Sequence, residues 1–117
     1  MIVTIKTIKE DEISYLEFNF VLEFGIKFSF KVDEPYLCTF EEWEKLANGN
    51  GTVSLYQGNG EGSIESKNDE MIFVAAPSGS GGDVTSTFTI PLAHVSSELK
   101  RVLDEVKKEG WFDEKNY

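Results

Sequence analysis

The sequence predicts an α+β fold whose elements follow the order βββ-α-ββββ-α. Two observations support this prediction: several stretches alternate apolar and polar residues with a period of two, and two stretches show the helical period. Strict alternation gives a strand one buried and one solvated face, which is typical of antiparallel sheets. We therefore expect one or more antiparallel twisted sheets of about seven strands, with a short central helix and a longer C-terminal helix.

Three strands are expected before the first helix, over residues 2–9, 13–24 and 26–32. The first is rich in β-branched residues, which favour strands. The second and third alternate regularly and meet at Gly25, where we expect a hairpin rather than one long strand bent at the glycine. A three-residue loop over 24–26 keeps paired residues on one face and pairs Glu23 with Lys27 and Phe20 with Phe30. The expected inward side chains are Leu16, Phe18, Phe20, Leu22, Phe24, Ile26, Phe28, Phe30 and Val32.

The two predicted helices have clear end signals. Thr39 and Glu42 have the spacing of a capping box at the start of a helix over residues 39–48, and Gly49 can end it in a left-handed conformation. The apolar residues of 95–109 recur at helical spacing, and Gly110 is placed to end that helix. Trp111 and Phe112 are expected to anchor its end in the core.

Four more strands are expected over residues 52–56, 63–67, 71–76 and 84–90. Glycine-dense residues 58–62 read as a turn, and residues 77–83 have the composition of a mobile loop. No linker divides the chain, so residues 1–117 are expected to form a single domain, with residues 113–117 as a frayed tail.

Composition narrows the function. The chain has 21 Asp and Glu against 11 Lys and Arg, so its net charge is −10, which disfavours direct contact with nucleic acid or anionic membranes. A single cysteine excludes an internal disulfide and is typical of a reducing compartment. No apolar run is long enough to span a bilayer, and Met1 precedes a strand-like pattern rather than a signal sequence. We therefore expect a cytoplasmic protein.

No catalytic constellation is apparent. His94 is the only histidine, so neither a catalytic triad nor a histidine-based zinc site gains support. Cys38 lies beside a helix start, where a thiol can become reactive, but packing in the core is the simpler interpretation. The two glycine-rich loops carry Glu61 and Asp83, charges that oppose phosphate binding. We expect no enzymatic activity, no cofactor and no metal site.

The acidic turns are therefore the candidate functional surface. Carboxylates there can present a negative surface to a basic partner, and exposed tyrosines can add aromatic anchors. Two tyrosines, Tyr15 and Tyr56, lie near acidic turns or on the solvated face of the sheet. The candidate partner-binding residues are Glu10, Asp11, Glu12, Tyr15, Glu17, Glu23, Tyr56, Glu61, Asp69 and Glu70.

A small, acidic, Phe-rich α+β chain with the segment Thr39-Phe40-Glu41-Glu42-Trp43 before a sheet, and a final strand followed by an amphipathic helix, resembles the bacterial toxin-immunity proteins of the contact-dependent growth-inhibition type. The resemblance implies an inhibitor that binds one cognate basic toxin domain, a nuclease, and occludes its active site or substrate groove. The element order is also similar to the Whirly fold of single-stranded DNA-binding proteins, with three clear strands before the first helix where that fold has four. That similarity concerns architecture only, since the charge does not suit nucleic acid.

Two alternatives from other classes stay open. The chain could be a non-catalytic structural module that self-associates as a homodimer, through sheet edges or its Trp111-Phe112 end. It could also be a small-molecule enzyme or carrier with a pocket under the Phe-rich sheet. Concentration-dependent mass would support the first, and a ligand retained through purification the second.

Overall fold

The computed structural model describes residues 1–10, 13–57, 60–77 and 86–113. Its elements follow the order βββ-α-ββββ-α, as predicted, and its strands form two antiparallel sheets. The three-stranded sheet has the order β1-β2-β3, and the four-stranded sheet has the order β4-β5-β6-β7. The strands are β1 (Ile2–Glu10), β2 (Ile13–Val21), β3 (Lys27–Asp33), β4 (Gly51–Gln57), β5 (Gly60–Lys67), β6 (Glu70–Pro77) and β7 (Ser86–Pro91). The predicted frayed tail beyond residue 113 and the predicted mobile loop beyond residue 77 lie outside the described residues.

The β2–β3 connection is a hairpin, but its register differs from the prediction. Phe20 pairs with Phe28 and Val21 with Lys27, and the Leu22 N–H donates to the carbonyl of Ile26 at 2.7 Å. The loop therefore spans Glu23–Gly25, one residue earlier than expected. Both registers keep paired residues on one face, so alternation alone could not choose between them. The expected pairs Glu23–Lys27 and Phe20–Phe30 are wrong.

The β5 strand begins earlier than predicted. It starts at Gly60 rather than Ser63, so Gly62 lies within a strand and not in a turn. A Cβ atom at Gly62 would stand 2.8 Å from the carbonyl oxygen of Val74 on β6, which explains the glycine.

Both helices begin and end close to their predicted limits. They are α1 (Phe40–Ala47) and α2 (Ser96–Lys108), and short 3₁₀ turns precede each of them. The Thr39 hydroxyl accepts from the Glu42 N–H, and the Glu42 carboxylate accepts from the Thr39 N–H, which confirms the capping box. Gly49 has the left-handed conformation that was expected, with a φ angle of 95°, and Gly110, predicted to end the second helix, has a φ angle of 84°. Neither helix, within the described part of the chain, is long and apolar enough to cross a membrane.

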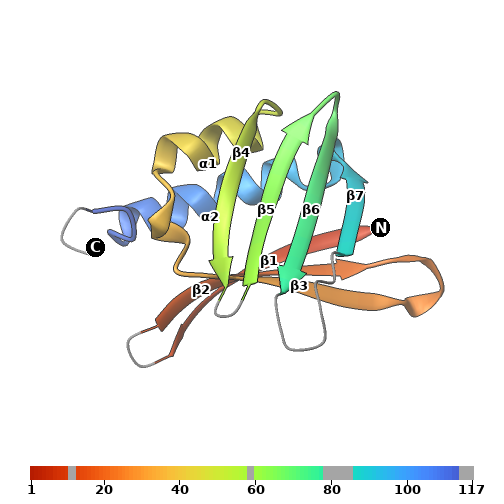
Figure 1. Ribbon diagram of the computed structural model, residues 1–117, viewed down its shortest axis with the longest axis horizontal. Coiled ribbons are helices and arrows are strands. Elements are labelled where there is room, and N and C mark those ends of the chain that lie inside the picture. The colour runs from red at the N-terminus through yellow and green to blue at the C-terminus, as the bar shows by residue number, and fades with distance from the viewer. Residues whose placement is uncertain (11–12, 58–59, 78–85, 114–117) are drawn as a thin grey trace.

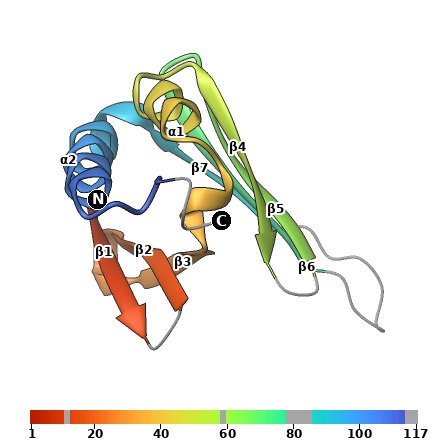
Figure 2. The ribbon, with the colours of Figure 1, turned by 90° about the vertical axis from the view of Figure 1, so that its left-hand side faces the viewer.

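The two sheets are inclined to one another, and both helices lie in the angle between them (Figures 1 and 2). The α1 helix packs on β4 and β5, while α2 packs on β1 and α1. Phenylalanines from both sheets fill the space where the sheets meet, with ring centroids 4.8–5.5 Å apart for several edge-on and stacked pairs. The rings are Phe18, Phe20, Phe28, Phe30, Phe73 and Phe88. These rings pack against one another on the inner face of the Phe-rich sheet.

Candidate functional site

The register fixes the neighbours of Glu17 on the outer face of the three-stranded sheet. Glu17 pairs with Lys6 on β1 and with Lys31 on β3, so lysines flank it on both sides. Over the four rows from Ile2 to Ile8, this face carries three lysines and two carboxylates. Over these four rows the outer face is therefore not an acidic surface. The residues in those rows are Ile2, Val21 and Lys27; Thr4, Asn19 and Ser29; Lys6, Glu17 and Lys31; and Ile8, Tyr15 and Asp33.

Tyr15 is a poor candidate for an exposed anchor. The residue is only 7% exposed, although it lies in the outward-facing row. The Lys31 Nζ atom stands 3.9 Å from the centroid of its ring, a distance that permits a cation–π interaction. The ring is therefore largely covered by the protein itself.

The remaining predicted residues belong to separate segments of the chain. Glu10 ends β1, and Asp11 and Glu12 fall outside the described residues. Glu23 is exposed in the β2–β3 loop, and Asp69 and Glu70 are exposed where β5 turns into β6.

Tyr56 and Glu61 are paired across β4 and β5, but their side chains are not described. The β2–β3 loop and the β5–β6 turn lie at different ends of the molecule (Figure 1). Those of the predicted residues whose side chains are described do not come together in one surface.

Only a few carboxylates in the described ranges take part in ion pairs. Arg101 contacts Glu98 at 2.8 Å and Glu105 at 2.7 Å, and Lys67 lies 3.5 Å from Glu65. The hydrogen bond from Arg101 lowers the pKa of Glu98. In turn, Glu98 and Glu105 raise the pKa of Arg101. The Glu98 carboxylate also accepts the backbone N–H of Ile5 at 3.0 Å, so it joins α2 to β1. This network has a structural role.

Cys38 has the features of a packed thiol. It is 7% exposed, and its Sγ donates to the carbonyl of Ser54 at 3.2 Å. Burial, followed by the charge of Glu42, raises the pKa of the thiol, against a smaller lowering by the Ser54 hydrogen bond. The thiol is therefore protonated at neutral pH, which removes the nucleophile that a reactive cysteine would need. Among the residues that the structure describes, no group of three metal-ligating side chains occurs.

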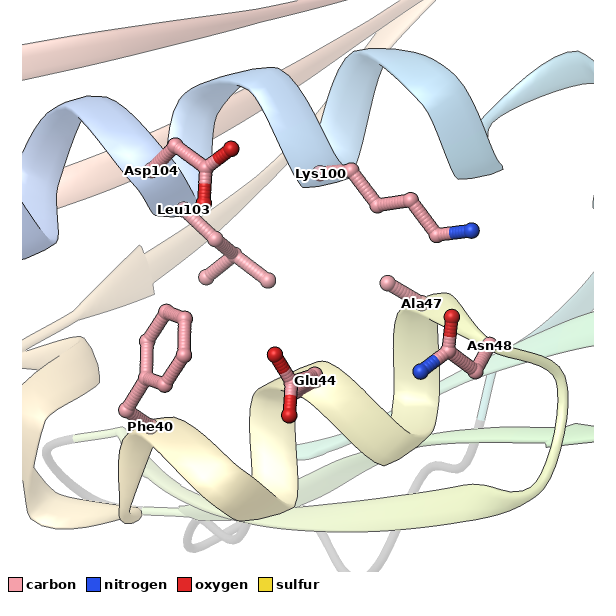
Figure 3. Close-up of a pocket in the computed structure, with 7 residues that line it drawn as sticks. All are labelled: Phe40, Glu44, Ala47, Asn48, Lys100, Leu103 and Asp104. Atoms are coloured by element: carbon pink, nitrogen blue, oxygen red, sulfur yellow. The ribbon is translucent and has the colours of Figure 1, made fainter.

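A groove between α1 and α2 was not predicted from the sequence. It is open to solvent and has a volume of about 280 Å³. Figure 3 shows Glu44 from α1 and Asp104 from α2 on opposite walls, with Leu103 between them and Lys100 extending toward Asn48. Residues more than fifty positions apart meet here, so only the packing of the two helices could reveal the groove. The groove is lined by both acidic and basic side chains, so its charge does not indicate which class of ligand it would bind.

A cluster of exposed apolar residues was also missed. Within the described ranges, five large apolar residues are strongly exposed, and four of them belong to the start of β1 and the β2–β3 loop: Met1, Ile2, Phe24 and Ile26. Phe24 and Ile26 were predicted to face the core and are instead 97% and 57% exposed, because Phe24 is the middle residue of the Glu23–Gly25 loop and Ile26 directly follows that loop. The neighbouring Gly25, which permits a positive φ angle, was the available sequence signal.

Comparisons with known proteins identify the fold and no family. No family model matches the chain, and a search of curated proteins finds no match. A chain from crystal structures of Trypanosoma brucei MRP1/MRP2 is similar in fold, with a TM-score of 0.58 and 12% sequence identity. The match covers 91% of this chain and 74% of the other. At this identity the similarity supports the α+β architecture alone.

Proposed function

We propose that this protein is a non-catalytic inhibitor of the toxin-immunity type. It acts in the cytoplasm, binds a cognate basic toxin domain, a nuclease, and occludes its active site or substrate groove. The observation that carries the proposal is the large excess of carboxylates, a net charge of −10, of which few in the described residues are neutralised by ion pairs. The negative electrostatic potential of such a chain speeds its association with a basic surface and disfavours association with an acidic surface.

The size of the molecule limits how many acidic regions one partner can cover. The surface measures 7245 Å², whereas a standard interface buries about 800 Å² on each side. Glu23 lies in a different loop from Asp69 and Glu70, and none of the three forms an ion pair with another described residue. One partner therefore engages one or two of these regions, and the others contribute through long-range attraction.

The test is affinity capture of the tagged chain from its native host at about 50 mM and then 200 mM salt, since screening increases over this range. Capture of one basic chain, together with protection of cells from a toxin encoded beside this gene, supports the proposal. The double variant Asp69→Asn/Glu70→Gln and the single variant Glu23→Gln identify which region is engaged. Lys6→Gln, which makes the chain more negative, is the matched control. Capture of nothing at either salt, without protection, would overturn the proposal.

A second candidate is a homodimeric structural module, and the outer face of the four-stranded sheet favours it. Within the described side chains this face carries mainly hydroxyl groups, with half-buried Ile72 and Val74 at its centre and the carboxylates Glu65 and Glu70. Two chains of charge −10 repel each other least at such a surface. Mass measured by light scattering over a concentration series tests this candidate, and Val74→Glu should abolish any dimer.

A further inference from the structure

The β2–β3 loop combines strong exposure with an uncommon backbone conformation. Phe24 is 97% exposed, and Ile26 and Ile2 are 57% and 64% exposed. Ile2 pairs with Val21 on β2, and Leu22 is hydrogen-bonded to Ile26, so the apolar residues belong to the same end of one sheet. Figure 1 shows this hairpin projecting beyond the rest of the three-stranded sheet.

The conformation of Phe24 is not explained by packing. Its φ and ψ angles are 62° and 19°, in the left-handed region, and Gly25 follows with φ 77°. For a non-glycine residue this conformation costs about 1 kcal/mol or more. Glycine, asparagine or aspartate are the usual residues there. Phe24 gains almost no burial in return, so the fold itself does not account for an aromatic residue at this position.

The loop holds its shape through the backbone. The Leu22 N–H donates to Ile26 O at 2.7 Å, and the Ile26 N–H contacts the Glu23 carbonyl at 3.4 Å. Below the loop, β2 and β3 are paired from Val21–Lys27 to Tyr15–Asp33. The ring and the neighbouring Glu23 carboxylate are thus presented on a paired hairpin, which lowers the entropy lost on binding.

The side chains of Phe24 and Glu23 are chemically complementary to a groove that binds nucleotides. Such grooves hold bases by stacking on aromatic or arginine side chains, and hold phosphates with basic groups. Phe24 offers a planar ring and Glu23 offers an anion at the adjacent position. Lys27, the nearest lysine in sequence, belongs to the outer face of the sheet.

Resting on the inhibitor function above, we propose that the tip of the β2–β3 hairpin enters the nucleic-acid groove of a basic partner, where Phe24 takes the place of a base and Glu23 that of a phosphate. Ile26 and Ile2 then lie against the rim of the groove. Aromatic anchors of this kind carry a large share of binding energy in protein interfaces.

The experiment uses photochemical crosslinking of the full chain, produced in its native host and irradiated in the lysate of those cells. The probe p-benzoylphenylalanine replaces Phe24 or, as a matched control, Leu37, which is 55% exposed outside this hairpin. The proposal expects a crosslink from position 24 to a basic chain and none from position 37. A nuclease-resistant phosphorothioate oligonucleotide added to the lysate before irradiation should suppress the crosslink.

Each other outcome overturns the proposal in a distinct way. A crosslink that the oligonucleotide does not affect places the tip outside the groove, while the inhibitor function stands. A crosslink to a second copy of this chain, or no crosslink, removes the hairpin as the partner-binding element. If the captured partner is bound and cells are protected, the variant Phe24→Asn should weaken binding about tenfold or more. Unchanged affinity would defeat this inference alone, whereas absence of protection by the parent chain would defeat the proposed function.

Discussion

Ser66 joins three elements of the fold through one buried hydroxyl group. It lies on β5 and is 2% exposed. Its Oγ donates to the carbonyl of Leu46 in α1 at 2.8 Å and accepts from the backbone N–H of Gly51, at the start of β4, at 3.2 Å. We predict that Ser66→Ala destabilises the protein although it removes only one oxygen atom.

The magnitude follows from the two hydrogen bonds. A typical intramolecular hydrogen bond contributes a net of about 1 kcal/mol, and a buried polar group left without a partner costs about 1–3 kcal/mol. The Leu46 carbonyl keeps a second donor, the N–H of Gly49 at 3.1 Å, so its loss is smaller than that of the Gly51 N–H. We expect the free energy of unfolding to fall by about 2 kcal/mol, or a Tm lower by roughly 8 °C for a domain of this size.

Urea unfolding followed by tryptophan fluorescence measures this change, because both Trp43 and Trp111 are buried. Ser63→Ala is the matched control, since Ser63 lies on the same strand and faces outward. The control should change stability by less than about 0.5 kcal/mol. If both variants shifted the urea midpoint equally, the hydroxyl of Ser66 would not connect these elements in the way described.

Three further predictions concern single residues. Gly62→Ala should lower the free energy of unfolding by about 1–3 kcal/mol, because its Cβ would stand 2.8 Å from the carbonyl oxygen of Val74; a thermal melt equal to that of the parent chain would contradict the close approach. Thr39→Ala should cost about 1 kcal/mol in urea unfolding through loss of the capping box, and Thr39→Ser should restore most of it. The pKa of Glu98 is lower in the folded chain than its ordinary value of 4.5, so its contribution is present above that pH and is lost as the pH falls through the folded value. The stability difference between the parent chain and Glu98→Gln should therefore shrink on acidification, and a difference independent of pH would contradict this linkage.

The sequence predicted the architecture because each element carried its own local signal. Alternation defined the strands, and the Thr39 and Gly49 signals located both ends of α1. The prediction of the β2–β3 register was wrong because alternation fixes only which face of the sheet a residue occupies. The position of the loop depends on which residues adopt positive φ angles, and here Phe24 adopts one as well as Gly25.

The candidate site was harder to predict because it depends on neighbours that are distant in sequence. Glu17 was predicted to be an exposed acidic residue, but the pairing of β2 with β1 and β3 places it between Lys6 and Lys31. Tyr15 read as an outward aromatic, but Lys31 covers its ring. The residues that lie opposite one another depend on the register of each strand pair, which alternation leaves open. Charge composition alone therefore did not predict which surface would meet a basic partner.

The distribution of charge limits the parts of the surface at which a basic partner can dock. Three lysines against two carboxylates cover the four outer rows of the three-stranded sheet, and the described outer face of the four-stranded sheet carries mainly hydroxyl and aliphatic groups. A net charge of −10 must then lie chiefly on turns, sheet ends and helices. A partner attracted by that charge meets an edge or a loop before it meets a sheet face. The β2–β3 tip is the described sheet end that adds a fully exposed aromatic ring to a carboxylate, so it offers both the attraction and the apolar contact that a stable complex with a basic partner would need.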